Sequence, residues 1–283
     1  MPTAISNPEV VPASLFYFVP PVDGSKGRTY VSKPPEGTPQ FNYETAKHTL
    51  EIENVRGKEG AYDLDSAGFS FAKHPANHKS FLDDEEVERE YYPESIELLK
   101  KLTGASKVVL FDHTIRRRRD GEDGMQDPKK RAPVPRVHVD QTTEAATNRV
   151  RRHLPTEEAE ERLKHRFQII NLWRPISHAA IDWPLALCDF RSVNVKKDLV
   201  PVDLVYPDRV GETFGVQFNP QHKWKYLKGM TPEEVVLIKC YDSIEDGTVA
   251  VLTPHTAFED PTTPHGSPYR ESIELRALVF YDD

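Results

Sequence analysis

The chain has 283 residues and a mass of 32.3 kDa, with a net charge of −8 and a pI of about 5.8. This acidic balance argues against a nucleic-acid-binding protein, because such proteins present a basic surface. No segment approaches the ~18 consecutive apolar residues of a membrane span, and no secretion signal is recognisable. Cys188 and Cys240 are too few for a disulfide scaffold or a four-cysteine zinc site. We therefore expect a soluble, cytoplasmic globular protein with no nucleic-acid or membrane partner.

Frequent prolines interrupt the amino-terminal part of the chain and leave short apolar pieces such as LFYF at residues 15–18. Such pieces predict edge strands, or an extended segment that drapes over a core formed elsewhere. Apolar residues at Ile96, Leu98, Leu99 and Leu102 predict a helix over residues 94–102, ended by Gly104. We expect one domain over residues 1–283, in which 1–105 form an amino-terminal segment and helix and 106–283 form the core.

The core sequence is dominated by short apolar runs. Residues 107–111 (KVVLF) and 136–140 predict strands, and residues 142–153 and 156–165 predict two helices. Further strands are predicted at 167–173, 185–189, 215–218, 234–241, 248–252 and 272–281. Many short strands, few helices and no alternation of strand and helix indicate a β-sandwich or jelly roll.

Two basic clusters, residues 116–119 (RRRR) and 129–131 (KKR), lie between the first two of these strands. They are either an anion-binding or nucleic-acid-binding patch or a solvated loop. Acidic residues at 120, 122, 123 and 127 flank them, which favours the solvated loop.

A histidine and an aspartate stand two positions apart in RVHVD, residues 136–140. Because side chains two apart in a strand point to the same face, His138 and Asp140 can reach one cavity. An imidazole and a carboxylate are two of the three ligands of the facial triad in non-haem Fe(II) oxygenases. A His-x-Asp pair arises about once by chance in a chain of this composition, so the pair alone indicates little.

Residues near the carboxyl end make the pattern more specific. His255 follows the predicted strand 248–252, and Arg270-Glu271-Ser272 leads into a long apolar strand. A histidine on a late strand can supply the third ligand. An arginine on the next strand has a planar fork that binds a carboxylate at two points.

At these residues the chain resembles the Fe(II)/2-oxoglutarate-dependent oxygenases. Within them it is most similar to a group that includes aspergillic-acid hydroxylase-like proteins, a fungal gibberellin desaturase and the cephalosporin 7α-methoxylase component. The resemblance covers residues 108–281. It is carried by VHVDQT (137–142), NLWRPI (171–176), PLALCD (184–189), FNPQHKWKYLKGMTPEEVVLIKCYDS (218–243), TPHTAFEDP (253–261) and RESIELRALVF (270–280).

The resemblance implies a mainly β fold: a double-stranded β-helix (jelly roll) core with flanking helices and an extended amino-terminal segment. It implies His138, Asp140 and His255 as Fe(II) ligands, 2-oxoglutarate as co-substrate and O₂ as oxidant. The implied activity is a dioxygenase that hydroxylates or desaturates a small secondary metabolite through a ferryl intermediate. A carboxylate ligand at position 140 argues against halogenation, because chloride would need that coordination site.

The arginine that binds 2-oxoglutarate is left open between two candidates. Arg270, Ser272, Glu274 and Arg276 share one strand face. We favour Arg270 because of the Arg-x-Ser pattern, in which case Arg276 pairs with Glu274 or another acidic neighbour.

Several other residues are candidates for the substrate pocket. Asn171, Trp173 and Arg174 lie on one predicted strand, although a tryptophan among aliphatic residues is more often core. His222, Trp224 and Tyr226 share a face of a strand that the alternating lysines predict to be half-exposed, and Trp224 is the candidate pocket wall among them. Gln141 and Thr142 are candidates for orienting Asp140. His113 is expected to be structural, His265 to lie in a loop, and both cysteines to be buried.

Two alternative functions remain at this point. A cupin-like metal enzyme of non-oxidative type would use the same ligands but leaves Arg270 and Ser272 unexplained. A metal-free jelly-roll module that binds a small molecule could have the same strand pattern.

Overall fold

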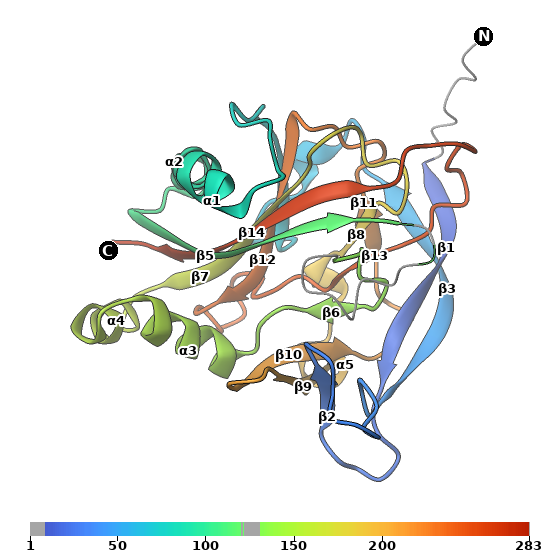
Figure 1. Ribbon diagram of the computed structural model, residues 1–283, viewed down its shortest axis with the longest axis horizontal. Coiled ribbons are helices and arrows are strands. Elements are labelled where there is room, and N and C mark those ends of the chain that lie inside the picture. The colour runs from blue at the N-terminus through green and yellow to red at the C-terminus, as the bar shows by residue number, and fades with distance from the viewer. Residues whose placement is uncertain (1–8, 120, 122–130, 283) are drawn as a thin grey trace.

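The computed structural model describes residues 9–119, 121 and 131–282. Two β-sheets dominate these residues (Figure 1). The nine-stranded sheet has the order β1-β3-β11-β8-β13-β6-β10-β9-β2, and the five-stranded sheet has the order β4-β12-β7-β14-β5. The mainly β fold is the predicted jelly roll.

The larger sheet contains β1 (Val10–Val19), β2 (Gly27–Tyr30), β3 (Glu44–Asn54), β6 (His138–Val139), β8 (Leu185–Cys188), β9 (Leu199–Val205), β10 (Val210–Val216), β11 (Trp224–Tyr226) and β13 (His255–Ala257). The smaller sheet contains β4 (Phe69–Lys73), β5 (Lys107–Arg117), β7 (Phe167–Pro175), β12 (Glu234–Asp242) and β14 (Glu271–Phe280). The α-helices are α1 (Asp84–Glu86), α2 (Tyr92–Thr103), α3 (Thr143–His153), α4 (Thr156–Arg162) and α5 (Val195–Asp198), and a π-helical turn (Val87–Tyr91) joins α1 to α2.

Helix α2 covers the outer face of the smaller sheet (Figure 1). Its Leu98 and Leu99 are buried in one cluster with Ile273 and Leu275 of β14. The helix ends at Gly104, which adopts a left-handed conformation with φ of 73°. The predicted helix and its glycine stop are therefore confirmed, with the helix slightly longer than predicted.

The amino-terminal segment is more regular than predicted. β1 and β3 pair antiparallel along the whole length of β1, and inward residues of β1 alternate with outward ones. Pro12 is tolerated because β1 lies at the edge of its sheet, where a missing N–H costs no ladder hydrogen bond. β1, β2 and β4 are edge strands, as predicted, but the expectation of only short pieces was wrong.

Several other elements differ from the sequence prediction. Residues 248–252 form no strand, because this segment bonds to the loop before β4 instead, as in the Ala250 N–H to Asp65 carbonyl bond of 2.6 Å. The strand predicted at 215–218 starts earlier, at Val210, and the second helix predicted after Asp140 ends at Arg162. β5 continues through Arg116 and Arg117, because it pairs with β14 over its full length. The solvated loop predicted for these two arginines was therefore wrong, and Lys129 and Lys130 lie outside the described residues.

The pairing of distant strands positions the site. β6 and β13 are neighbours in the larger sheet, where His138 and His255 lie opposite each other. In the smaller sheet, Asn171 of β7 lies opposite Arg276 of β14. Side chains from both sheets therefore meet between them. No helix among the described residues is long and apolar enough to cross a membrane.

Candidate metal centre and cavity

The three predicted metal ligands converge. Ligand atoms of His138, Asp140 and His255 all lie within 4.8 Å of one another. Asp140 Oδ1 is 3.3 Å from His138 Nε2 and 3.9 Å from His255 Nε2. Two imidazoles and one carboxylate are the donor set of the Fe(II) facial triad. The residues present therefore fit an Fe(II) ion.

Both histidines present the same ring nitrogen to this point. His138 Nδ1 is 2.8 Å from the Arg136 carbonyl, and His255 Nδ1 is 3.0 Å from the Thr253 carbonyl. Each Nδ1–H donates to its carbonyl, which leaves the Nε2 lone pair free for a metal. Burial and the nearby His138 lower the pKa of His255, so its ring is neutral and ready to bind a cation.

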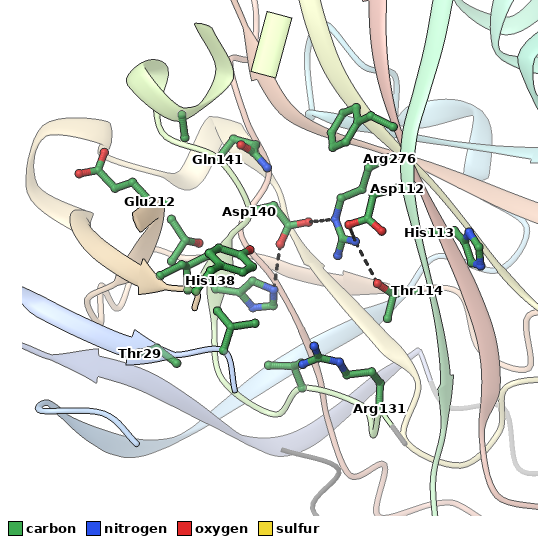
Figure 2. A pocket seen from close by; sticks show the side chains of 18 of the residues that line it. Thr29, Asp112, His113, Thr114, Arg131, His138, Asp140, Gln141, Glu212 and Arg276 are labelled. Carbon is green, nitrogen blue, oxygen red and sulfur yellow. Dashed lines mark hydrogen bonds and ion pairs between the residues drawn. The ribbon is translucent and has the colours of Figure 1, made fainter. Parts of the chain in front are cut away.

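The second oxygen of Asp140 is held by the smaller sheet. Asn171 Nδ2 donates to Asp140 Oδ2 at 2.7 Å. Arg276 Nε is 3.4 Å from the same oxygen (Figure 2). Burial alone would raise the pKa of Asp140, but Arg276 and the two histidines hold it well below its usual range. The carboxylate is therefore ionised, with Oδ1 directed at the histidines. Asn171 contacts the metal ligand rather than forming a substrate wall.

Arg276 is already engaged by several partners. It pairs with Glu274. It also lies 3.3 Å from Asp112 and donates to Thr114 Oγ1 at 3.0 Å (Figure 2). The pairing with Glu274 is the one expected for the arginine that does not bind the co-substrate.

Arg270 has an unused donor. Its Nη1 donates to the Trp183 carbonyl at 2.7 Å, and its guanidinium lies 5.7 Å from the centre of the Trp173 ring. Arg270 Nε and Ser272 Oγ are both buried, and neither has a hydrogen-bond partner in the described part of the chain. A buried guanidinium and a hydroxyl two positions further along the chain therefore each keep an unpaired polar group, which fits the distal carboxylate of 2-oxoglutarate.

A large cavity of about 1340 Å³ opens beside the triad. His138, Asp140, Gln141 and Arg276 line it together with β5, α3, β9 and β10 residues (Figure 2). Arg116 also lines it, so this member of the basic run faces the site and not bulk solvent. The strand prediction for 107–111 would have included Arg116 if it had been extended by five residues.

Other predicted site residues lie elsewhere. Trp173 packs in a core cluster with Phe69 and Val236. Arg174 points to the opposite face of β7, where its Nη1 donates to the His74 carbonyl at 3.0 Å. A substrate role for Arg174 was therefore a wrong prediction, because adjacent residues of a strand face opposite sides.

Trp224 is also a correction. It is buried in the core of the larger sheet, where its Nε1 donates to Tyr17 Oη at 2.8 Å, and it does not line the large cavity. The half-exposed strand was a wrong prediction too, since Lys225 is 8% exposed and pairs with Glu53.

The remaining minor candidates are structural. Thr142 caps α3 by accepting from the Ala145 N–H and makes no hydrogen bond to Asp140. His113 bridges Tyr92 Oη at 2.9 Å and Asp84 at 3.1 Å, as expected for a structural histidine, although it borders the cavity. His265 lies in a turn, and both cysteines are fully buried, as predicted.

Comparison with known proteins defines the class. A family model described as "Oxidoreductase/YMDC permease-like domain" matches residues 15–280. "Hydroxylase/desaturase efuI" of Hormonema carpetanum is 35% identical over all of this chain and 99% of the relative. "Fe(II)/2-oxoglutarate-dependent dioxygenase nvfI" of Aspergillus novofumigatus is 32% identical over 94% of this chain and 96% of the relative.

A solved structure agrees with these relatives. The "iron and alpha-ketoglutarate-dependent endoperoxidase NvfI" superposes with a TM-score of 0.85 and 29% identity, over 97% of this chain and 99% of the other. The chain therefore belongs to the Fe(II)/2-oxoglutarate-dependent oxygenases, which are oxidoreductases that use Fe(II), 2-oxoglutarate and O₂. Neither a non-oxidative cupin-like enzyme nor a metal-free binding module accounts for this membership.

Proposed function

We propose that this protein uses Fe(II), 2-oxoglutarate and O₂ to hydroxylate or desaturate an unactivated carbon of a small metabolite. The observation that supports the proposal most directly is the approach of two imidazole Nε2 atoms and one carboxylate oxygen to a common point beside a large cavity. The donors come from His138, Asp140 and His255, and we propose that they are the metal ligands.

Each residue of the site has a distinct task in this proposal. His138, Asp140 and His255 would hold Fe(II) and leave coordination positions for 2-oxoglutarate and O₂. Bound Fe(II) would let O₂ serve as the oxidant that removes hydrogen from the substrate, with 2-oxoglutarate converted to succinate and CO₂. Arg270 binds the distal carboxylate of 2-oxoglutarate as a planar fork, and Ser272 donates its hydroxyl to the same group. The unpaired Arg270 Nε and Ser272 Oγ support this assignment.

The surrounding residues position the ligands and limit the entry of water. Asn171 and Arg276 keep Asp140 Oδ2 occupied, so that only Oδ1 is directed at the metal. The substrate binds in the cavity beside the three metal ligands, where fixed side chains replace bulk water.

Succinate formation from 2-oxoglutarate tests the function. The protein is reconstituted anaerobically with Fe(II), given 2-oxoglutarate and O₂, and assayed for succinate with and without candidate substrates. We expect Fe(II)-dependent succinate that is lost in His255→Ala. Tight metal binding without succinate would favour a non-oxidative metal enzyme, and no metal binding would favour a binding module.

A second experiment tests the arginine assignment. The apparent constant for 2-oxoglutarate is compared in Arg270→Ala and Arg276→Ala. We expect Arg270→Ala to raise it by about tenfold or more, since a charge-assisted pair is lost. If Arg276→Ala alone raises the constant, the assignment of Arg270 is wrong.

A further inference from the structure

Part of the wall of the large cavity is apolar. Aromatic and aliphatic side chains from β1, β5, β9 and β10 line it, among them Phe18, Phe111, Leu204 and Phe214. A cavity of about 1340 Å³ with such walls accommodates a scaffold of several rings, because it exceeds the usual ~300–1,000 Å³ of drug-sized pockets.

The carboxylates of this cavity are either paired or exposed. Asp203 and Glu212 both pair with Lys26 at 2.5 Å, and Asp140 is held by Arg276. The lining carboxylates that have no cation partner among the described residues are exposed to solvent: Asp83, Glu85, Glu88 and Glu144. Negative charge is therefore neutralised where the cavity wall is half-buried.

Positive charge is not neutralised in the same way. Four half-buried arginines line the cavity and have no ion pair with a carboxylate of the described residues: Arg116, Arg131, Arg136 and Arg149. Three of them have other contacts. Arg116 donates to the Ala132 carbonyl at 2.9 Å, Arg136 donates to Tyr43 Oη at 3.0 Å, and Arg149 lies 5.1 Å from the centre of the Phe111 ring.

Arg131 differs from the other three. Its guanidinium makes no hydrogen bond, ion pair or ring contact with any residue in the described ranges, so all its donors are open. Its backbone is anchored to the cavity wall, because its carbonyl accepts from the Arg117 N–H of β5 at 3.0 Å. Figure 2 shows the Arg131 side chain among those that line the pocket containing His138, Asp140 and Arg276.

We propose that the substrate is an apolar, ring-containing molecule that bears a carboxylate, and that Arg131 binds this carboxylate. This inference rests on the proposed function and names the substrate class of the same site. A guanidinium binds a carboxylate at two points, and the unpaired charge of Arg116 nearby strengthens the attraction. The apolar walls bind the ring system, so the two contacts together fix which carbon faces the metal ligands.

Binding of matched acids and esters tests the proposal. The probes are aromatic and alicyclic monocarboxylic acids of one to four rings, each paired with its methyl ester. Their dissociation constants are measured by anaerobic calorimetry on the protein loaded with Fe(II) and 2-oxoglutarate. We expect at least one acid to bind about tenfold or more tightly than its ester, and Arg131→Ala to abolish that preference. In the charge reversal Arg131→Glu, an amine with the same ring system should instead bind more tightly than the acid.

Two controls distinguish a failure of the proposed substrate class from a failure of the proposed function. Arg151→Ala changes an exposed arginine that pairs with Glu160 away from the cavity, and it should keep the acid preference. Iron-dependent oxidation of 2-oxoglutarate to succinate tests the proposed function on its own. If that reaction occurs but no acid binds more tightly than its ester, the substrate class is wrong. If Arg131→Ala raises the constant for 2-oxoglutarate and leaves the acid preference intact, Arg131 is a co-substrate residue and the proposal is overturned.

Discussion

At the scale of single residues, Asp140 is the best-defined group of the site. Its two oxygens face different surroundings: Oδ1 faces the histidines, and Oδ2 faces Asn171 and Arg276. Partners of a metal ligand orient it and tune its basicity, so they influence the affinity for metal without touching it. Asn171 is the stronger of the two contacts by distance.

Asn171→Ala should therefore weaken Fe(II) binding by about ten- to hundred-fold, the range typical of such partners. Anaerobic equilibrium dialysis of Fe(II) measures the effect. Asn219→Ala is a matched control, because it removes an amide that donates to a different aspartate, Asp198, at 3.1 Å. Similar losses of affinity in both variants, or none in Asn171→Ala, would contradict the positioning role.

At the scale of elements, the site depends on how closely β10 approaches β1. Gly215 of β10 lies opposite His138 of β6, and a Cβ at Gly215 would lie 2.6 Å from Phe18 Cγ of β1. Such a contact forces either the ring or the strand to move, and overpacking of this kind costs about 1–3 kcal/mol.

Gly215→Ala should lower the free energy of unfolding by about 1–3 kcal/mol. It should also weaken Fe(II) binding, because a shift of β10 also moves β6, which pairs with it and carries His138. Urea unfolding and metal titration measure the two effects. Gly211→Ala, on the same strand, places its Cβ 3.3 Å from the edge of the Tyr206 ring and should have a smaller effect. Equal effects of the two substitutions would show that the Phe18 contact is unimportant.

A buried ion network ties β12 to β7. Lys239 Nζ and Arg166 Nη2 each lie 2.7 Å from Asp242 Oδ2, and Gln168 Nε2 donates to the same oxygen at 2.7 Å. Burial alone would raise the pKa of Asp242, but Arg166 and Lys239 hold it below its usual value. Stability from this group is therefore present above the unfolded pKa of about 3.9 and is lost as the pH falls through the folded pKa.

Asp242→Asn should reduce the free energy of unfolding by about 2 kcal/mol at neutral pH, because buried Lys239 then keeps only Asp65, at 2.8 Å, as a carboxylate partner among the described residues. The difference from the wild type should shrink as the pH falls below about 4. Urea unfolding at several pH values measures it. Asp246→Asn, a change at a fully exposed aspartate, should have little effect at any pH. A deficit independent of pH would show that packing, not charge, is responsible.

At the scale of the whole molecule, the metal centre joins the two sheets. His138 and His255 come from the larger sheet, and Asp140 is held by Asn171 and Arg276 of the smaller one. A ligand that binds only the folded state stabilises it according to its saturation, by about 2.7 kcal/mol at a hundred times its dissociation constant.

Fe(II) with 2-oxoglutarate should therefore raise the melting temperature under anaerobic conditions, and a chelator should reverse the rise. Differential scanning calorimetry measures both changes. His255→Ala should remove the metal-dependent part of the rise, since one of three ligands is lost. A rise of the same size in His255→Ala would mean that the stabilising metal binds elsewhere.

The features that could be predicted were those encoded over a few residues. The two-residue spacing of His138 and Asp140 requires only strand periodicity, and Gly104 marks the end of α2 through its own backbone preference. Trp224 was misinterpreted because alternation identifies the faces of a strand but not which cavity, if any, a face borders. Arg116 was misinterpreted because a run of four arginines is typical of a solvated loop. The pairing of β14 along β5, which includes Arg116 in a strand, is not visible in the local sequence.

The sequence by itself determined the mainly β class, the identity of the three metal-ligand candidates and the Arg-x-Ser pair, since each is a matter of residue type and local spacing. Only the tertiary structure decided that β6 and β13 are neighbours, that Asn171 and Arg276 hold Asp140, and that Arg131 faces the cavity with its donors open. The physical reason is that hydrogen bonding between strands far apart in the chain sets which side chains meet. Which strands pair depends on the burial of both sheets together and not on any one segment.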